Sequence, residues 1–409
     1  MSLKRISVKH LRVGMYLQEP CGSWMDHPFW RTKFKIEDPQ DVVTLQASSV
    51  TEVWIDTKKG LDVEALTDAE DRSAVEAEAE QVLIDAMQPV IHREDVAREL
   101  ERAVSICSEA KQAVSSMFNE ARMGKALDAA DAMPLVEEIS NSVSRNPGAL
   151  ISLARLKTKD DYTYMHSVAV CGLMIALARQ LGLNEAQTRQ AGMAGLLHDI
   201  GKMMIPLEIL NKPGRLTDEE FDAVKNHPSE GHKLLLEGHG VDEVTLDVCL
   251  HHHEKVDGTG YPDKLKDEEI SLFAKMGAVC DVYDAITSNR PYKNGWDPAE
   301  SLRKMAEWSK GHFDPKVFQA FVKSVGIYPI GSLVKLESGR IGVVIDQTEK
   351  SLLTPKVKVF YSTKSNLRIT PEVLDLSSTI VRDKIVSRED PDKWHFADLN
   401  ELWGGVTLW

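Results

Sequence analysis

The sequence predicts a mainly α fold: a helical bundle, preceded by a small mixed or β domain and followed by a small β-rich module. Three observations support this fold class. The chain between residues 131 and 325 has the pattern of helices and carries most of the histidines. Runs rich in β-branched and aromatic residues occur near both ends of the chain. An acidic, strongly helix-forming stretch follows the first of these regions.

These changes of pattern divide the 409 residues into four regions: 1–64, 65–130, 131–325 and 326–409. In the first region, VTEVWID predicts a strand because β-branched and aromatic residues dominate it. In the last region, GSLVKLESGRIGVVID predicts two strands joined by a Ser-Gly turn. KVKVFYS predicts another strand because polar and apolar residues alternate. We expect these last strands to form a small antiparallel module.

The region 65–130 is expected to contain helices that link the first domain to the bundle. TDAEDRSAVEAEAEQVLIDAM predicts a helix with Thr67 or Asp68 as its N-cap, and Pro89 is expected to end or kink it. REDVARELERAVSICSEAKQAVSSMF predicts a second helix, since its apolar residues recur near helical spacing. Such helices could pack on the bundle or form a contact between two copies of the chain, which would make a homodimer.

The composition limits the class of protein. With 43% hydrophobic and 27% charged residues, the chain has ample material for a core. A net charge of −14 argues against a DNA- or RNA-binding protein, so an anionic substrate would need metal ions or a few placed Lys and Arg residues. The N-terminal segment lacks an apolar signal region, and no run approaches the roughly 18 apolar residues of a membrane span. Five scattered cysteines favour free thiols in the cytoplasm.

Histidines and aspartates of the third region form a series with similar intervals. The series is His166, His198, Asp199, His227, His252, His253 and Asp281. His198 and Asp199 are adjacent, and both can flank one point only from a helix end or an inward-facing turn. Alone, this pair would more often be a core histidine with a capping acid. The intervals of 25 to 32 residues each suit one helix plus a connection, so successive helices could send ligands to a shared centre.

The residue types in this series predict a metal centre. Imidazole and carboxylate suit iron, manganese, zinc, nickel or cobalt, and the lack of cysteine argues against a structural zinc site. Four or more histidines with two aspartates are too many for one ion and suit two ions bridged by a carboxylate. Two divalent ions about 4 Å apart stabilise an in-line displacement at phosphorus and create hydroxide at neutral pH.

The series resembles that of the HD-domain metal-dependent phosphohydrolases. HHHEKVDGTGYPDKL resembles the HHE-x-x-DGxGYP signature of the HD-GYP subfamily, and HDIGK, HPSEG, DVYDAITSNRPYK and GHFDP match further motifs in order. The first region, 1–64, also resembles the uncharacterised domain that often precedes HD-GYP in bacterial signalling proteins. The resemblance implies a helical bundle around two or three metal ions, commonly iron or manganese, which hydrolyses the bacterial second messenger cyclic di-GMP.

The resemblance also implies two ligand sets. They are His166, His198, Asp199 and Asp281 for one ion, and Asp199, His227, His252 and His253 for the other. Asp199 would bridge the ions, and a metal-bridging hydroxide would attack one phosphodiester bond. His251 falls outside the pattern and is expected to be exposed or to lie behind the ligands. Glu254 is expected to orient a ligand imidazole.

Other residues of these motifs are expected to contact the substrate. Lys202 would contact the scissile phosphate and assist the leaving oxygen, unless it simply satisfies a helix C-terminus. Tyr261 lies in a turn forced by neighbouring glycines and a proline, and would shape the pocket. Arg290 and Lys293 would bind phosphate or guanine, with a surface salt bridge as the alternative.

One position departs from the family. Some members have a glutamate four residues before the first histidine, which helps to hold a third metal; here that position is Tyr162. We therefore expect two metal ions, which bears on whether hydrolysis stops at linear pGpG or continues to GMP. Two alternative functions stay open. One is a general HD-type nucleotide phosphohydrolase or a hydrolase of another cyclic dinucleotide, and the other is a non-hydrolytic cyclic di-GMP sensor that docks signalling partners.

Overall fold

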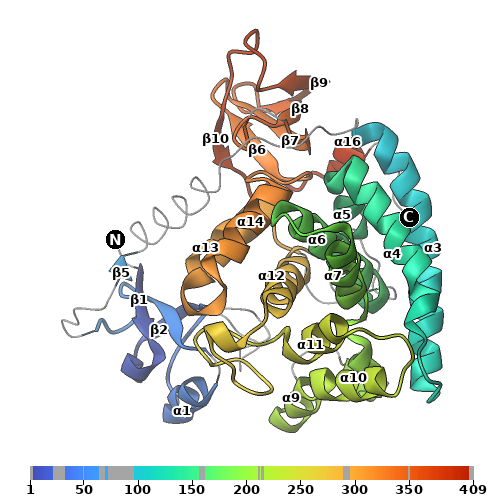
Figure 1. Ribbon diagram of the computed structural model, residues 1–409. Coiled ribbons are helices and arrows are strands. Elements are labelled where there is room, and N and C mark those ends of the chain that lie inside the picture. Colours follow the sequence, from blue (N-terminus) through green and yellow to red (C-terminus); the bar gives the residue numbers. More distant parts are fainter. Residues whose placement is uncertain are drawn as a thin grey trace.

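A computed structural model shows a helical bundle with a small sheet near each end of the chain (Figure 1). The structure describes residues 3–21, 33–48, 50–63, 70–71, 96–155, 162–210, 212, 216–288, 295–348 and 351–404. The mainly α fold class with flanking sheets is confirmed. Within these residues, every helix is too short or too polar to cross a membrane.

The N-terminal sheet contains antiparallel strands in the order β3-β2-β4-β1-β5. Its elements are β1 (Leu3–Ser7), η1 (Val8–His10), β2 (Tyr16–Pro20), β3 (Phe34–Lys35), α1 (Pro39–Ala47), β4 (Glu52–Asp56) and β5 (Glu70–Asp71). The strand predicted from VTEVWID is confirmed by β4. Its Val53 and Ile55 side chains are buried with Leu17 of β2 and Leu45 of α1, which gives this small domain its own core.

The helix expected to begin at Thr67 or Asp68 is wrong at its start. Glu70–Asp71 is extended and pairs with Lys4 and Arg5 of β1. An open sheet edge offers backbone hydrogen bonds, and this tertiary contact overrides local helix propensity. The rest of the predicted helix, with Pro89, lies outside the described residues. The second predicted helix is confirmed by α3, which runs from Val96 to Arg122.

The bundle packs its helices around α6 and α12 (Figure 1). Its helices are α3 (Val96–Arg122), α4 (Ala129–Arg145), α5 (Pro147–Arg155), α6 (Tyr162–Gln180), α7 (Glu185–Leu197), η3 (Ile200–Met204), α8 (Leu207–Leu210), α9 (Asp218–Lys225), α10 (His227–Leu236), α11 (Glu243–His251), η4 (Asp267–Glu269), α12 (Leu272–Thr287), α13 (Pro298–His312) and α14 (Pro315–Val325). Both central helices are buried on nearly all sides, which fits their nearly continuous apolar sequences. Helix α3 packs on α4, α5 and α6, so it forms part of the bundle's wall.

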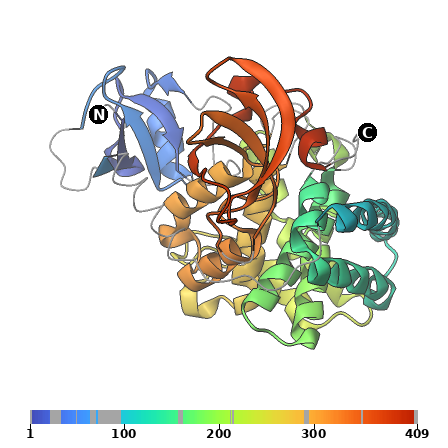
Figure 2. The ribbon, with the colours of Figure 1, turned by 90° about the horizontal axis from the view of Figure 1, so that it is seen from above.

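The C-terminal module is a second antiparallel sheet, ordered β10-β6-β7-β8-β9. Its elements are β6 (Leu333–Leu336), β7 (Arg340–Asp346), β8 (Lys356–Ser362), β9 (Leu367–Asp375), β10 (Ile385–Arg388), α15 (Pro391–Trp394) and α16 (Leu399–Gly404). The three predicted strands are confirmed by β6, β7 and β8. Figures 1 and 2 show this sheet over the end of α14, and its apolar side chains share a core with the bundle.

The N-terminal sheet meets the bundle at α13 through charged side chains. The Lys304 ammonium donates to Glu19 Oε1 at 2.6 Å, and Arg5 Nη1 donates to the Glu307 carbonyl oxygen at 3.2 Å. Arg5, Lys304 and Glu307 are all buried. Contacts of this polar kind are typical of interfaces between domains.

Candidate metal centre

All seven side chains of the predicted metal series meet in one buried cluster within the bundle. They are His166 from α6, His198 and Asp199 after α7, His227 from α10, His252 and His253 after α11, and Asp281 from α12. None of these side chains is more than 8% exposed. The structure thus brings the series together, while the role of each residue as a ligand stays a prediction.

The adjacent His198 and Asp199 reach one point because a helix ends beside them. Helix α7 ends at Leu197, and His198 keeps a helical backbone as its C-cap (φ −53°, ψ −35°). Asp199 then turns the chain into η3 (φ −101°, ψ 9°). The helix-end geometry expected for this pair is confirmed.

The Asp199 carboxylate lies between two pairs of imidazoles. Its Oδ2 is 3.3 Å from His166 Nε2 and 3.4 Å from His198 Nε2. Its Oδ1 is 3.2 Å from His227 Nε2 and 3.9 Å from His252 Nε2. Within each pair the two Nε2 atoms are 3.3 Å apart. One carboxylate therefore faces a group of histidine nitrogens with each of its oxygens.

Asp281 lies on one side of this arrangement. Its Oδ1 is 3.0 Å from His166 Nε2 and 3.8 Å from His198 Nε2. Its Oδ2 is 3.8 Å from His253 Nδ1. Asp281 thus belongs mainly with His166 and His198, and its second oxygen approaches the other group.

Backbone carbonyls orient three of the imidazoles. His198 Nδ1 donates to the Gly195 carbonyl at 2.8 Å, and His227 Nδ1 donates to the Val224 carbonyl at 2.7 Å. His252 Nδ1 donates to the carbonyls of residues 248 and 249, both at 3.0 Å. A carbonyl oxygen only accepts, so each Nδ1 carries a proton and each ring turns its Nε2 toward the cluster.

His166 is oriented by a carboxylate instead, which the sequence analysis missed. Its Nδ1 is 2.6 Å from Asp284 Oδ2, and Ser288 Oγ donates to Asp284 Oδ1 at 3.1 Å. Asp284 is 2% exposed. The signal was present in DVYD, because residues three apart share a helix face and Asp281 already faces the cluster. Carboxylates in this position fix the orientation and raise the basicity of metal-binding imidazoles.

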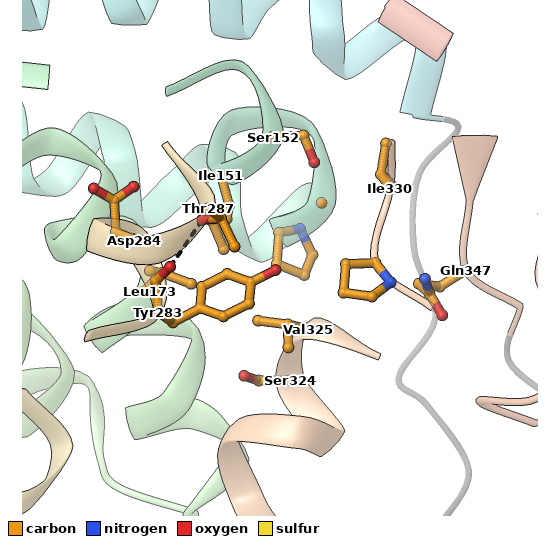
Figure 3. Close-up of a pocket in the computed structure, with 13 residues that line it drawn as sticks. Ile151, Ser152, Leu173, Tyr283, Asp284, Thr287, Ser324, Val325, Ile330 and Gln347 are labelled. Carbon is orange, nitrogen blue, oxygen red and sulfur yellow. Dashed lines mark hydrogen bonds between the residues drawn. The ribbon is translucent and has the colours of Figure 1, made fainter. Parts of the chain in front are cut away.

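A small cavity of about 20 Å³ lies beside Asp284 (Figure 3). Tyr283 and Thr287 of α12 line it together with Ile330 and Gln347 near the C-terminal sheet. The space suffices for about one water molecule, far too little for a nucleotide. The C-terminal module therefore packs closely against the bundle behind Asp284.

The cluster has the chemistry of a cation site. Asp199 Oδ1, Asp281 Oδ2 and His253 Nε2 are buried and have no hydrogen-bond partner within the described residues. His227 Nε2, whose ring carries its proton on Nδ1, lies 3.2 Å from Asp199 Oδ1. A carboxylate oxygen that faces an imidazole nitrogen in a buried site needs a proton or a metal cation between the two atoms. The residues present therefore fit divalent metal ions.

The pKa values describe the same imbalance. Burial lowers the pKa of His166, but its hydrogen bonds with Asp199, Asp281 and Asp284 raise it to about 9. Burial, with the charges of neighbouring histidines, lowers the pKa of His252 to about 3. Burial raises the pKa of Asp199, but Lys202 and the histidines hold it well below its usual range. The carboxylates thus stay charged and attract cations.

Family comparisons agree with this centre. Residues 138–317 match the HD domain, and residues 3–132 match a domain of unknown function, DUF3391. The chain is 56% identical over 406 residues to the cyclic di-GMP phosphodiesterase PA4108 of Pseudomonas aeruginosa, covering 99% of this chain and 96% of that protein. This chain belongs to the HD-GYP family.

Other relatives match a smaller share of the chain. The cyclic di-GMP phosphodiesterase response regulator RpfG of Xanthomonas campestris is 42% identical over 38% of this chain and 40% of its own length. The 3'3'-cGAMP-specific phosphodiesterase 1 of Vibrio cholerae is 34% identical over 43% of this chain and 41% of its own length. The solved structure of Bd1817, an HDG"Y"P protein from Bdellovibrio bacteriovorus, covers 78% of this chain and 98% of its own at 19% identity. Its TM-score of 0.46 is too low to bear on the site.

Membership of the HD-GYP family implies divalent metal binding. Two groups in the cluster each have ligand atoms close enough together for an ion: His166, His198 and Asp199, and His227, His252 and His253. The glycines of two HD-GYP motifs allow these groups to approach. A Cβ on Gly201 would overlap with the His227 carbonyl and the Gly231 backbone. Gly201 and Gly231 therefore let η3 lie directly on α10.

Lys202 and Tyr261 lie at the edge of the HD-GYP centre. The Lys202 ammonium contacts Asp199 Oδ2, and its side chain is 19% exposed. This contact favours a role at the centre over the alternative of satisfying a helix C-terminus. The Tyr261 ring stacks on His253, with ring centroids 4.7 Å apart and planes at 26°. Both side chains therefore contact residues of the metal cluster, and their roles toward a substrate stay predictions.

The residues that flank the ligand pair behave differently from each other. His251 is outside the cluster, as expected, and its imidazole lies between Asp247 and Asp263. The expectation that Glu254 orients a ligand imidazole is wrong. Its carboxylate accepts hydrogen bonds from the backbone N–H groups of residues 263–265, because the chain folds back over it.

Three predicted positions cannot be compared with the geometry. Arg290 and Lys293 lie outside the described residues. Tyr162 is the first residue of α6, and the structure does not describe its side chain. Their roles stay predictions.

Proposed function

We propose that this chain hydrolyses cyclic di-GMP to pGpG in bacterial second-messenger signalling, with two divalent metal ions, iron or manganese. The observation that carries the proposal is the position of Asp199, whose two oxygens face two separate groups of histidine nitrogens. Carboxylate bridges of this kind suit pairs of divalent ions. The name of the relative that matches 99% of this chain supports the substrate.

Each ion has its own ligand set in this proposal. His166, His198, Asp199 and Asp281 hold the first ion, and Asp199, His227, His252 and His253 hold the second. The contacts of Asp281 Oδ1 with His166 and His198 support the first set. His253 Nε2, which is buried and has no hydrogen-bond partner in the part of the chain that the structure describes, supports its role in the second. When bound, divalent ions polarise phosphate oxygens and lower the pKa of water.

The chain's own side chains complete the chemistry. Lys202 stands beside the bridging carboxylate and is partly exposed, so its ammonium can reach a phosphate and give a proton to the departing 3′-oxygen. Tyr261 forms one wall of the pocket through its stacking on His253. Arg290 and Lys293 bind the nucleotide's phosphate or guanine groups, for which their charge and donor geometry are suited.

The same proposal includes the product and the location of the reaction. Tyr162 replaces the acidic residue that would help to hold a third ion, so two ions and pGpG as the main product are expected. The cysteines within the described residues are all unpaired, which supports a reducing cytoplasm. Contacts with signalling partners or a second copy of the chain belong to the flanking modules in this proposal.

A second candidate substrate rests on one observation. A relative named for 3'3'-cGAMP is 34% identical over 43% of this chain, so similarity of this extent does not by itself select the base. We expect cyclic di-GMP to be hydrolysed faster than 3'3'-cGAMP because the full-length relative is named for cyclic di-GMP.

The test uses protein prepared without oxygen and loaded separately with Fe(II) or Mn(II). Each preparation is mixed with cyclic di-GMP or 3'3'-cGAMP, products are identified by chromatography and mass spectrometry, and bound metal is counted. Formation of pGpG with two ions per chain is the expected result. Prompt GMP would contradict the two-ion argument, and tight binding of cyclic di-GMP without turnover would make the chain a sensor.

A further inference from the structure

The loop of residues 254–265 follows the pair His252 and His253. Its first part, residues 254–257, leads away from the pair and is called the outgoing arm. Its last part, residues 261–265, folds back onto the pair and is called the returning arm. A Cβ on Gly260 would lie 2.5 Å from Glu254 Cα and 2.6 Å from the His253 carbonyl oxygen, so only glycine permits this approach. The next residue, Tyr261, donates its backbone N–H to the His253 carbonyl at 3.3 Å. The Tyr261 ring can then stack on the His253 imidazole. The position of Tyr261 therefore depends on the contacts that fix the returning arm.

The Glu254 carboxylate binds the backbone of the returning arm. Its Oε1 accepts from the backbone N–H of Asp263 at 2.7 Å and of Lys264 at 3.0 Å, and its Oε2 accepts from Leu265 at 3.1 Å. Lys264 has a left-handed backbone (φ 58°), which turns successive N–H groups toward one point. Such a concavity binds an anion, and here a carboxylate that is 2% exposed fills it.

The His251 imidazole contacts a side chain of the same arm. Its Nδ1 is 2.7 Å from Asp247 Oδ1, and its Nε2 is 3.1 Å from Asp263 Oδ2. Asp247 also accepts a hydrogen bond from Ser271, the N-cap of α12. The imidazole thus ties α11 to the returning arm, and Asp247 ties both to the start of the helix that carries Asp281.

Helix α13 holds the outgoing arm. The backbone N–H of Asp257 donates to the Gly311 carbonyl at 3.0 Å, and Val256 donates to the His312 carbonyl at 3.4 Å. These bonds form where α13 bends at Gly311, whose φ is +83°. Backbone bonds thus join the outgoing arm to α13, while the side chains of Glu254 and His251 contact the returning arm.

From these contacts we propose that Glu254 and His251 are positioning residues, which hold the 254–265 loop so that Tyr261 forms a fixed wall over His253. Among residues 251–254, His252 and His253 then face the centre. The two outer residues of this run hold the loop. The kinetic consequence rests on the proposed function, since a fixed wall matters only when substrate binds there. The structural consequence, an ordered returning arm, does not.

The test compares Glu254→Gln and His251→Asn with two exposed controls, Glu268→Gln and His239→Asn. A glutamine oxygen can still accept two N–H groups, but its amide donor faces the Leu265 N–H. Hydrogen exchange is measured in metal-loaded protein without substrate. We expect exchange at residues 261–265 to become about 10-fold faster in Glu254→Gln, less so in His251→Asn, and to stay unchanged in both controls.

Metal content and kinetics complete the test. We expect both variants to keep their full metal content, while kcat/KM for cyclic di-GMP falls about 10-fold in Glu254→Gln. Wild-type exchange and kinetics in both variants would overturn the proposal, as would metal loss as large as that of Asp199→Asn. If Glu254→Gln fails to fold, His251→Asn alone decides, because it removes only one contact of the arm. A wild-type protein inactive on cyclic di-GMP would overturn the proposed function, while the exchange data would still decide the role of the two side chains.

Discussion

Two buried carboxylates in the bundle, Glu99 and Asp199, have opposite surroundings. Glu99 on α3 is fully buried, and its oxygens accept hydrogen bonds from Ser142 at 2.7 Å, from Arg102 at 3.1 Å, and from Arg145 at 2.7 and 2.8 Å. Asp199 is equally buried, but its Oδ1 meets imidazole nitrogens and no donor among the described residues. Side chains of the protein therefore stabilise both oxygens of Glu99. At Asp199 they stabilise the charge only in part, and a bound cation would supply the rest.

The largest effect that this comparison predicts is loss of the centre in Asp199→Asn. The amide keeps the size of the side chain but removes the charge that faces both histidine groups. We expect turnover of cyclic di-GMP to fall by about 10³-fold or more, together with loss of bound metal, while the metal-free protein keeps its stability. Product formation, metal content and thermal unfolding measure these three quantities. Full activity with depleted metal would refute the proposed centre.

The second effect, on Glu99→Gln, is of the opposite kind. This change removes the charge that Arg145 pairs with, and because the Arg145 side chain is 30% exposed we expect a cost of about 2 kcal/mol of unfolding free energy. We expect turnover per folded molecule to stay at the wild-type level, because Glu99 lies outside the metal cluster. Urea denaturation and steady-state kinetics provide the measurements. Glu101→Gln, an exposed change on the same helix, is the control.

We expect an intermediate effect on metal binding at Asp284. Like Glu99, its oxygens are hydrogen-bonded by other side chains, and like Asp199, it contacts a histidine of the metal cluster. Both of its oxygens have partners, His166 and Ser288, so the protein stabilises its charge. We expect Asp284→Asn to weaken metal binding by about 10- to 100-fold without abolishing folding. A metal titration followed by calorimetry measures this, with Ser288→Ala as a milder companion. Unchanged metal affinity would show that His166 needs no carboxylate to hold its orientation.

The same contrast explains how far the sequence could lead. The seven residues of the metal series were predictable because they lie in motifs whose spacing matches one ligand per helix, and the structure brings all seven together. The role of Glu254 was not predictable from its neighbours. Its partners are backbone N–H groups of residues 263–265, which converge only because Lys264 takes a left-handed conformation.

The ends of the fold show a similar limit. Strands β4, β6, β7 and β8 followed from local alternation and β-branched composition, which the chain carries in each segment. Strand β5 did not, because Glu70–Asp71 lies in a stretch whose composition favours a helix, and it is extended where it pairs with β1. Asp284 was predictable only in part. Its spacing from Asp281 places it on the same helix face, but the spacing does not indicate that it contacts His166.

The smallest effect that we predict is a pH dependence of the Glu99 contribution. Burial raises the pKa of Glu99, but hydrogen bonds from Arg145, Ser142 and Arg102 outweigh burial and leave it below its ordinary value of 4.5. A carboxyl whose pKa is lower in the folded than in the unfolded protein stabilises the fold above the unfolded pKa and loses that contribution as pH falls. The stability difference between wild type and Glu99→Gln should therefore be constant from pH 6 to 7 and shrink below about pH 4.5. Urea denaturation of both proteins, freed of metal so that the centre does not contribute, measures the difference. A gap that widens on acidification would mean that the carboxylate is not stabilised by its donors, and the contrast with Asp199 would fail.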